Sequence, residues 1–174
     1  MKTAEIRTDV NGGPVAAVRS RTPRSTRMSA SPHIVHVEDN PVDARLFERA
    51  VAAATPDTRI MWLRDGESAI AELERLAQPE AGLPALVVLD VKLPKVVGFD
   101  VLSYIRNSPK LSAVPVTMLT SSSQIADVVE AYTRGVNSFL SKPPTYGGLK
   151  EVVSHLVPYW LTHNRRVLSP ASAR

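Results

Sequence analysis

Acidic side chains follow two of the β-branched stretches in the sequence, at positions where they could bind a metal ion. Glu38 and Asp39 come directly after residues 33–37, and Asp90 ends the stretch 85–90. Three carboxylates brought close together repel one another, and they do not all stay ionised at neutral pH without a cation. Ligation by oxygen atoms alone suits a hard ion such as Mg²⁺. These residues therefore predict a Mg²⁺ site formed by Glu38, Asp39 and Asp90.

Hydroxyl and amino side chains end the later stretches and suit phosphoryl chemistry. Thr120 and Ser121 lie at the end of residues 114–120, and Lys142 follows residues 138–140. A carboxylate can accept a phosphoryl group when a cation screens its negative charge, and we interpret Asp90 as this acceptor. Lys142 would bind one phosphoryl oxygen, Thr120 would donate a hydrogen bond to another, and the small Ser121 would leave room for the group. A lone Asp or Lys is more often a cap or a solvated residue. The interpretation therefore rests on the occurrence of all these residues together, in this order along the chain.

A regular alternation of segments must position these residues. The β-branched stretches span residues 33–37, 58–63, 85–90, 114–120 and 138–140. Between them, apolar residues recur at helical spacing over residues 42–54, 66–77, 99–107, 124–134 and 146 to about 161. Because parallel strands need a helix-length crossover, the pattern predicts an α/β fold, a doubly wound (βα)5 three-layer sandwich with a five-stranded parallel sheet. Functional residues of such a sheet gather at the carboxyl ends of the strands.

The charge of the chain is concentrated at its N-terminus. Of the 21 Lys and Arg residues, six lie in residues 1–32, which hold two acids and leave 15 basic and 15 acidic residues in the rest. Because this segment is also rich in Ser, Pro and Gly, we expect residues 1–32 to form a disordered basic arm, unless translation starts at Met28. Residues 33–162 are expected to form one folded domain, followed by a C-terminal tail over residues 163–174. A neutral domain gives no indication of direct nucleic-acid binding.

Several other classes of protein are disfavoured by composition. The chain has no cysteine, which excludes disulfides, thiolate metal sites and a cysteine nucleophile. No apolar run approaches the roughly 20 residues needed to cross a bilayer, and the N-terminus lacks the apolar stretch of a secretory signal. We therefore expect a cytoplasmic protein without membrane insertion.

Four short motifs together resemble the receiver domain of two-component response regulators, which has the flavodoxin-like or CheY-like fold. The motifs are Glu38-Asp39-Asn40-Pro41, residues 88–94 with Gly98, Leu119-Thr120-Ser121 and Ser141-Lys142-Pro143. The resemblance spans residues 33–161. It implies that Glu38 and Asp39 form the acidic pair, that Asp90 is the phosphorylation site, and that the backbone carbonyl of Lys92 completes Mg²⁺ ligation.

The same resemblance assigns the switch residues. Thr120 and Lys142 match the switch hydroxyl and the phosphate-binding lysine, and Phe139 matches an aromatic residue that rotates inward when the Thr is drawn to the phosphoryl group. A cis peptide between Lys142 and Pro143 is also a feature of the family. Val97, at an often acidic position, and Lys92, a basic residue beside the phosphorylation site, depart from the usual pattern and could alter the dephosphorylation rate.

A narrower similarity points to partners. Residues 93–95 with Gly98-Phe99, Ala131-Tyr132, residues 136–139 and Tyr159-Trp160 look like the small single-domain regulators that serve bacterial phytochrome histidine kinases. This implies that a sensor histidine kinase phosphorylates Asp90 and that a homodimer forms through the face of the fourth helix, fifth strand and fifth helix. Because only a short tail follows Leu161, we expect output through an unidentified downstream protein, with no direct contact to nucleic acid.

Two alternatives differ in class from a phosphorylated signalling protein. A receiver fold can serve as a binding module that does not use phosphorylation, but the complete set Asp39, Asp90, Thr120 and Lys142 disfavours this. An aspartyl-phosphate phosphatase resembling haloacid dehalogenases would have a second Asp two residues after the nucleophile, where this chain has Lys92. We therefore expect no enzyme activity beyond phosphoryl transfer to Asp90 itself and its autodephosphorylation.

The remaining bulky residues are expected to be structural. His33 and His36 on the first stretch should be packed and hydrogen-bonded and not metal ligands. Pro158 should kink the last helix or start a new turn. Of Tyr159 and Trp160, one should pack in the core while the other is available for a dimer face.

Overall fold

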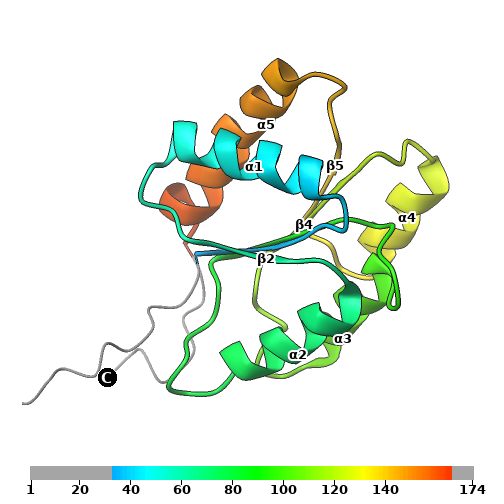
Figure 1. Cartoon of the computed structure of the whole chain (residues 1–174). Helices are drawn as coiled ribbons and strands as arrows, with labels where there is room; N and C mark the ends of the chain where they lie inside the picture. Colours follow the sequence, from blue (N-terminus) through cyan, green and yellow to red (C-terminus); the bar gives the residue numbers. More distant parts are fainter. Residues whose placement is uncertain (1–32, 166–174) are drawn as a thin grey trace, which may run out of the picture.

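The computed structural model describes residues 33–165, which form alternating strands and helices (Figure 1). The strands are β1 (Ile34–Val37), β2 (Ile60–Leu63), β3 (Leu86–Leu89), β4 (Val116–Thr120) and β5 (Ser138–Ser141). The helices are α1 (Pro41–Ala54), α2 (Gly66–Leu76), α3 (Gly98–Asn107), α4 (Ile125–Thr133) and α5 (Tyr146–Pro158), with a π-helical turn at Tyr159–His163. The expected arm, and the tail beyond residue 165, lie outside the described residues.

The strands form one parallel sheet with the order β2-β1-β3-β4-β5. This order is the flavodoxin-like one: β2 is added on one side of β1 and β3 on the other, so the order in which strands are added reverses between β1 and β3. Helices α1 and α5 cover one face of the sheet and α2, α3 and α4 cover the other, as Figure 1 shows. The predicted three-layer sandwich with a five-stranded parallel sheet is therefore confirmed.

Each face of the sheet has its own apolar core. On the α2–α3 side, Val87 and Leu89 of β3 pack with Leu102 and Ile105 of α3. On the other side, Leu86 and Val88 of the same strand join the core of α1 and α5. Because β3 is buried on both faces, its four residues are all apolar, and it fixes the position of the residue that follows it.

Side-chain caps set where the helices begin. Asn40 accepts a hydrogen bond from the amide of Val42, and Asp65 accepts one from the amide of Ser68 at 2.8 Å. The observed ends differ from the predicted ends by a few residues. For example, β4 starts at Val116 and not at residue 114, because Pro115 has no amide hydrogen for the ladder.

The end of α5 follows the expectation for Pro158. The α-helix stops there and continues as the π-helical turn Tyr159–His163, one residue beyond the predicted domain limit. Trp160 packs against the α1–α5 core while Tyr159 is 50% exposed, so the two aromatic residues divide as predicted.

Two sequence expectations are wrong. The described backbone contains no cis peptide bond, so the Lys142–Pro143 bond is trans. His36 is packed, with its ring centroid 4.2 Å from that of Phe47, but its Nδ1 atom has no hydrogen-bond partner. The ring lines the same cavity as Glu38 and Lys142, and neither of these side chains bonds to Nδ1.

Candidate functional site

The acidic residues lie at the carboxyl ends of the adjacent strands β1 and β3. Val37 and Leu89 are register partners, and the amide of Asp90 donates to the carbonyl of Val37 at 3.1 Å. Glu38 and Asp90 therefore leave the two strands side by side. Both side chains are buried, with relative exposures of 1% and 7%, whereas Asp39 is exposed.

Glu38, Asp39 and Asp90 form one carboxylate cluster. Each side chain offers an oxygen atom, and the three atoms lie within 4.8 Å of one another. Such an oxygen-only set, with one exposed member that leaves access to water, fits a hydrated Mg²⁺ ion. The structure therefore brings together the three predicted side-chain ligands, while the carbonyl of Lys92 stays a predicted ligand.

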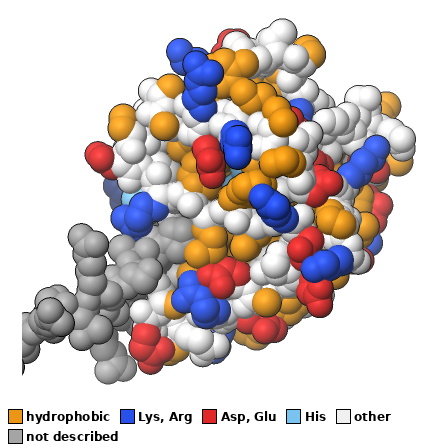
Figure 2. All heavy atoms as spheres, viewed as in Figure 1, with side chains coloured by type: hydrophobic (Ala, Val, Ile, Leu, Met, Phe, Trp, Pro, Cys, Tyr) orange, Lys and Arg blue, Asp and Glu red, His pale blue; other side chains and the backbone are white. Residues whose placement is uncertain are grey.

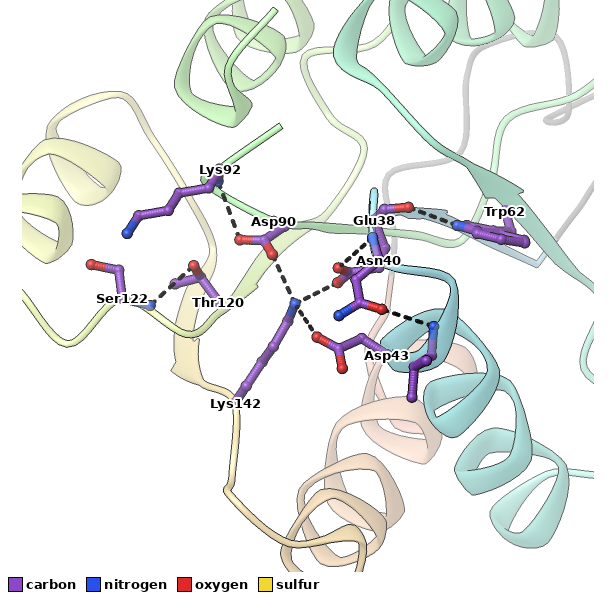
Figure 3. Close-up of polar contacts among 10 residues, drawn as sticks. Glu38, Asn40, Asp43, Trp62, Asp90, Lys92, Thr120, Ser122 and Lys142 are labelled. Atoms are coloured by element: carbon purple, nitrogen blue, oxygen red, sulfur yellow. Dashed lines mark hydrogen bonds and ion pairs between the residues drawn. The ribbon is translucent and has the colours of Figure 1, made fainter. Parts of the chain in front are cut away.

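Lys142 joins this cluster from the far side of β4. Its Nζ atom lies 2.5 Å from Oε2 of Glu38, 2.8 Å from Oδ2 of Asp90 and 3.1 Å from Oδ2 of Asp43. Figure 3 shows the amino group pointing into the space between these carboxylates. Its backbone is held at the end of β5, because the amide of Lys142 donates to the carbonyl of Thr120 at 2.7 Å. Sequence reasoning missed Asp43, which is otherwise an ordinary first-turn helix residue.

Burial and charge act against each other in this cluster. Burial raises the pKa of Glu38 to about 7, although the hydrogen bond from Lys142 works in the opposite direction. Burial alone would lower the pKa of Lys142, but its hydrogen bonds to Asp90 and Glu38 outweigh burial and raise it above its usual value. Lys142 therefore stays protonated. Burial, followed by the nearby Lys142 charge, lowers the pKa of His36 to about 3, so His36 is neutral.

Thr120 ends β4 beside the cluster. It is 1% exposed, and its Oγ1 atom accepts a hydrogen bond from the amide of Ser122 at 3.2 Å. Ser121 is exposed and lies on the wall of a cavity of about 220 Å³ that Lys142 also lines. On the next strand, Phe139 is partly buried against the α2–α3 core. Figure 3 shows Thr120 beside Asp90, while Ser121 shares the cavity wall with Lys142. Ser122 is an additional neighbour of Thr120 that the motifs did not indicate.

The loop after β3 holds the Asp90 carboxylate and passes close to it. The amide of Lys92 donates to Oδ1 of Asp90 at 3.2 Å, and the amide of Gly98 donates to the carbonyl of Val91 at 2.9 Å. A Cβ atom on Gly98 would lie 2.0 Å from the Asp90 carbonyl oxygen, so only glycine fits here. The start of α3 is therefore packed directly against the Asp90 backbone.

Trp62 supports the acidic pair from the edge strand β2. Its indole Nε1 donates to the backbone carbonyl of Glu38 at 2.8 Å, and the guanidinium of Arg64 lies 4.6 Å from the centre of its ring. Sequence reasoning missed this contact, because nothing in the motif signals that a tryptophan 24 residues away reaches the strand end.

Comparison with known families decides the identity of this arrangement. Residues 34–154 match the family model of the response regulator receiver domain. The chain belongs to the response regulator receiver family. This receiver domain carries its carboxylates, hydroxyl and lysine at the strand ends described above. Among residues 33–165, every helix is too short or too polar to span a bilayer.

Individual relatives agree with this assignment. The receiver is 43% identical over 132 residues to the probable methanogenesis regulatory protein FilR2 of Methanothrix harundinacea, a match that covers 76% of this chain and 85% of FilR2. It is 36% identical over 129 residues to the response regulator Rcp1 of Synechocystis, covering 74% of this chain and 88% of Rcp1.

Solved structures show the same fold. The phosphorylated cyanobacterial phytochrome response regulator RcpA superposes with a TM-score of 0.72 at 33% identity, covering 80% of this chain and 100% of RcpA. A Mn²⁺-bound form of Rcp1 superposes with a TM-score of 0.70 at 33% identity, covering 79% of this chain and 100% of that one. Both likenesses extend over nearly the whole described receiver.

Proposed function

We propose that this receiver accepts a phosphoryl group on Asp90 from a phosphohistidine of a sensor histidine kinase, with Mg²⁺ bound by Glu38, Asp39 and Asp90. The observation that carries the proposal is the position of the Asp90 carboxylate. It lies among the carboxylates of the acidic cluster, with the Lys142 ammonium 2.8 Å away. In the transfer, the nitrogen–phosphorus bond of the phosphohistidine breaks as an oxygen–phosphorus bond to Asp90 forms.

The surrounding residues have separate roles in this proposal. When bound, Mg²⁺ would screen the carboxylate charge and the charge on the transferring oxygens. Lys142 already contacts Asp90, so its ammonium is placed to bind one oxygen of the phosphoryl group. Thr120 donates its hydroxyl hydrogen to another oxygen, Ser121 leaves room beside it, and the carbonyl of Lys92 completes the metal ligands. Phe139, at the edge of the α2–α3 core, rotates inward when Thr120 moves toward the phosphoryl group.

Partners are proposed from the relatives and from the surface. Rcp1 and RcpA are response regulators, and RcpA is described as a phytochrome response regulator, which supports a phytochrome histidine kinase as the phosphoryl donor. Because such a kinase uses ATP, the two proteins would meet in the cytoplasm. Output would pass to a downstream protein and not directly to nucleic acid. Figure 2 supports the latter, because acidic and basic side chains are interspersed on the face that it shows.

Helix α4 offers a surface for the proposed homodimer of the α4, β5 and α5 face. Ile125, Val129 and Tyr132 are spaced by one helical turn and are 81%, 60% and 53% exposed. Three apolar side chains in a row on one helix are the kind of surface that a symmetric partner covers.

Intact-mass spectrometry after treatment with acetyl phosphate tests the proposal. We expect one adduct of about 80 Da that requires Mg²⁺ and is absent from Asp90→Asn. Asp57→Asn is the matched control, because Asp57 is exposed and precedes β2, at the opposite end of the parallel sheet from the acidic cluster. A folded wild-type protein that gains no adduct would instead support a binding module that does not use phosphorylation.

A further inference from the structure

Ser122 joins Thr120 to helix α4 through two different groups. Its amide donates to Oγ1 of Thr120 at 3.2 Å, as Figure 3 shows. Its hydroxyl donates to Oδ2 of Asp127, which lies in the first turn of α4. Ser122 is only 6% exposed, so both of its polar groups depend on these partners rather than on water. One small buried residue therefore lies between the proposed switch hydroxyl and a helix.

The first turn of α4 has few other attachments. Ala131, near the end of the helix, is its only fully buried residue, and the capping residue Gln124 makes no side-chain hydrogen bond to the helix. The opposite end is tied to α3, where Arg134 donates to Oγ of Ser103 at 2.8 Å. Within the described residues, the Ser122 hydroxyl is thus the main polar contact at the start of α4, because it donates to Asp127 and accepts from the amide of Gln124 at 3.4 Å.

We propose that Ser122 is a positioning residue that transmits the state of Thr120 to α4, an inference that rests on the proposed phosphorylation of Asp90. When Thr120 turns its hydroxyl toward a phosphoryl group, the buried amide of Ser122 loses its acceptor. Because an unpaired buried amide is costly, the turn that contains Ser122 must rearrange. Rearrangement withdraws the Ser122 hydroxyl from Asp127 and frees the start of α4.

Coupling of this kind is reciprocal. If occupation of the Asp90 site breaks the contact to Asp127, then removing the contact must favour occupation by the same factor. We therefore expect Ser122→Ala to bind beryllofluoride, a stable mimic of the phosphoryl group, about fivefold or more tightly than wild type in the presence of Mg²⁺. Ser122→Thr keeps a hydroxyl and should restore the wild-type affinity.

Hydrogen exchange of residues 121–130 gives the second readout. In wild type, beryllofluoride should speed amide exchange at the start of α4. In Ser122→Ala, exchange should already be fast without it and should change little on binding. Asp127→Ala should behave in the same way. Ser123→Ala is the matched control because Ser123 is an exposed neighbour, and it should behave as wild type.

The outcomes separate this inference from the proposed function. If wild type binds beryllofluoride and Ser122→Ala matches Ser123→Ala in both affinity and exchange, the coupling role of Ser122 is wrong while phosphorylation of Asp90 stands. The coupling role is also wrong if folded Ser122→Ala loses beryllofluoride binding, since Ser122 would then serve the site directly. Absence of both binding and a mass adduct in wild type would remove both proposals.

Discussion

Lys142 and Asp90 form an ion pair of 2.8 Å that joins the ends of β5 and β3, two strands that are not neighbours in the sheet. The lysine reaches across the end of β4 to make this contact. It also contacts Glu38. The ammonium therefore offsets the negative charge of the same carboxylates that would bind a metal ion.

Removing this ammonium should change metal binding and phosphorylation in opposite directions. We expect Lys142→Met, which keeps an unbranched stem as far as the ε position and removes the ammonium, to bind Mg²⁺ several-fold more tightly, because a positive charge close to the ligands is lost. Phosphorylation by acetyl phosphate should nevertheless slow by about tenfold or more, since Lys142 no longer contacts the transferring group. Isothermal titration calorimetry and timed intact-mass spectra measure the two effects.

Lys150→Met is the control for the change of charge, because Lys150 is exposed on α5. Weaker Mg²⁺ binding in Lys142→Met, or an unchanged phosphorylation rate, would contradict the assigned role of the lysine.

Mg²⁺ should stabilise the folded receiver through the acidic cluster. A ligand that binds only the folded state, at a concentration about 100 times its Kd, adds about 2.7 kcal/mol to the free energy of unfolding. We expect Mg²⁺ to raise the Tm of wild type and EDTA to reverse this. Asp39→Asn should lose most of the Mg²⁺ effect while Asp57→Asn retains it, as measured by thermal unfolding followed by circular dichroism. An equal rise in Tm for both variants would show that the cluster is not the binding site.

Gly98 should be intolerant of any side chain. Gly98→Ala places a Cβ atom 2.0 Å from the Asp90 carbonyl oxygen, so either α3 or the Asp90 backbone must move. We expect a loss of about 1–3 kcal/mol in the free energy of unfolding, measured in urea, together with slower phosphorylation. Gly147→Ala is the matched control, because its Cβ would lie 4.0 Å from Oγ1 of Thr145, an ordinary contact distance. Similar stabilities for the two variants would refute the close approach.

The apolar row on α4 should control self-association. Val129→Asp places a charge in the middle of the exposed residues Ile125, Val129 and Tyr132, and we expect it to convert a dimer to a monomer in size-exclusion chromatography with light scattering. Val42→Asp is the comparison, because Val42 is also exposed, at 62%, but lies on α1. A dimer that survives Val129→Asp and dissociates with Val42→Asp would place the interface on α1.

The fold could be predicted from the sequence because its two periodicities are clear. β-Branched stretches and helical spacing alternate throughout residues 33–161, and strand ends in a parallel sheet converge on one edge, which located Asp90, Thr120 and Lys142 together. The exact strand lengths were less predictable, since neighbours in the sheet decide how far each ladder extends.

Other parts of the site depend on three-dimensional contacts that leave no trace in a motif. Asp43 looks like a helix residue until α1 turns it toward Lys142. Ser122 reads as part of a serine-rich loop, and its role depends on burial against α4. The unpaired Nδ1 of His36 also depends on packing, because it reflects which neighbours the fold supplies.

The indole of Trp62, whose N–H group is bonded to the Glu38 carbonyl, gives the receiver an intrinsic optical probe. Indole emission is sensitive to the polarity and charge around the ring, and this ring is anchored one peptide unit from Asp39. The chain has only one other tryptophan, Trp160, which lies beyond α5 and away from the acidic edge. With Trp160 replaced by Phe, the fluorescence of the unlabelled protein would report events at the acidic pair in real time.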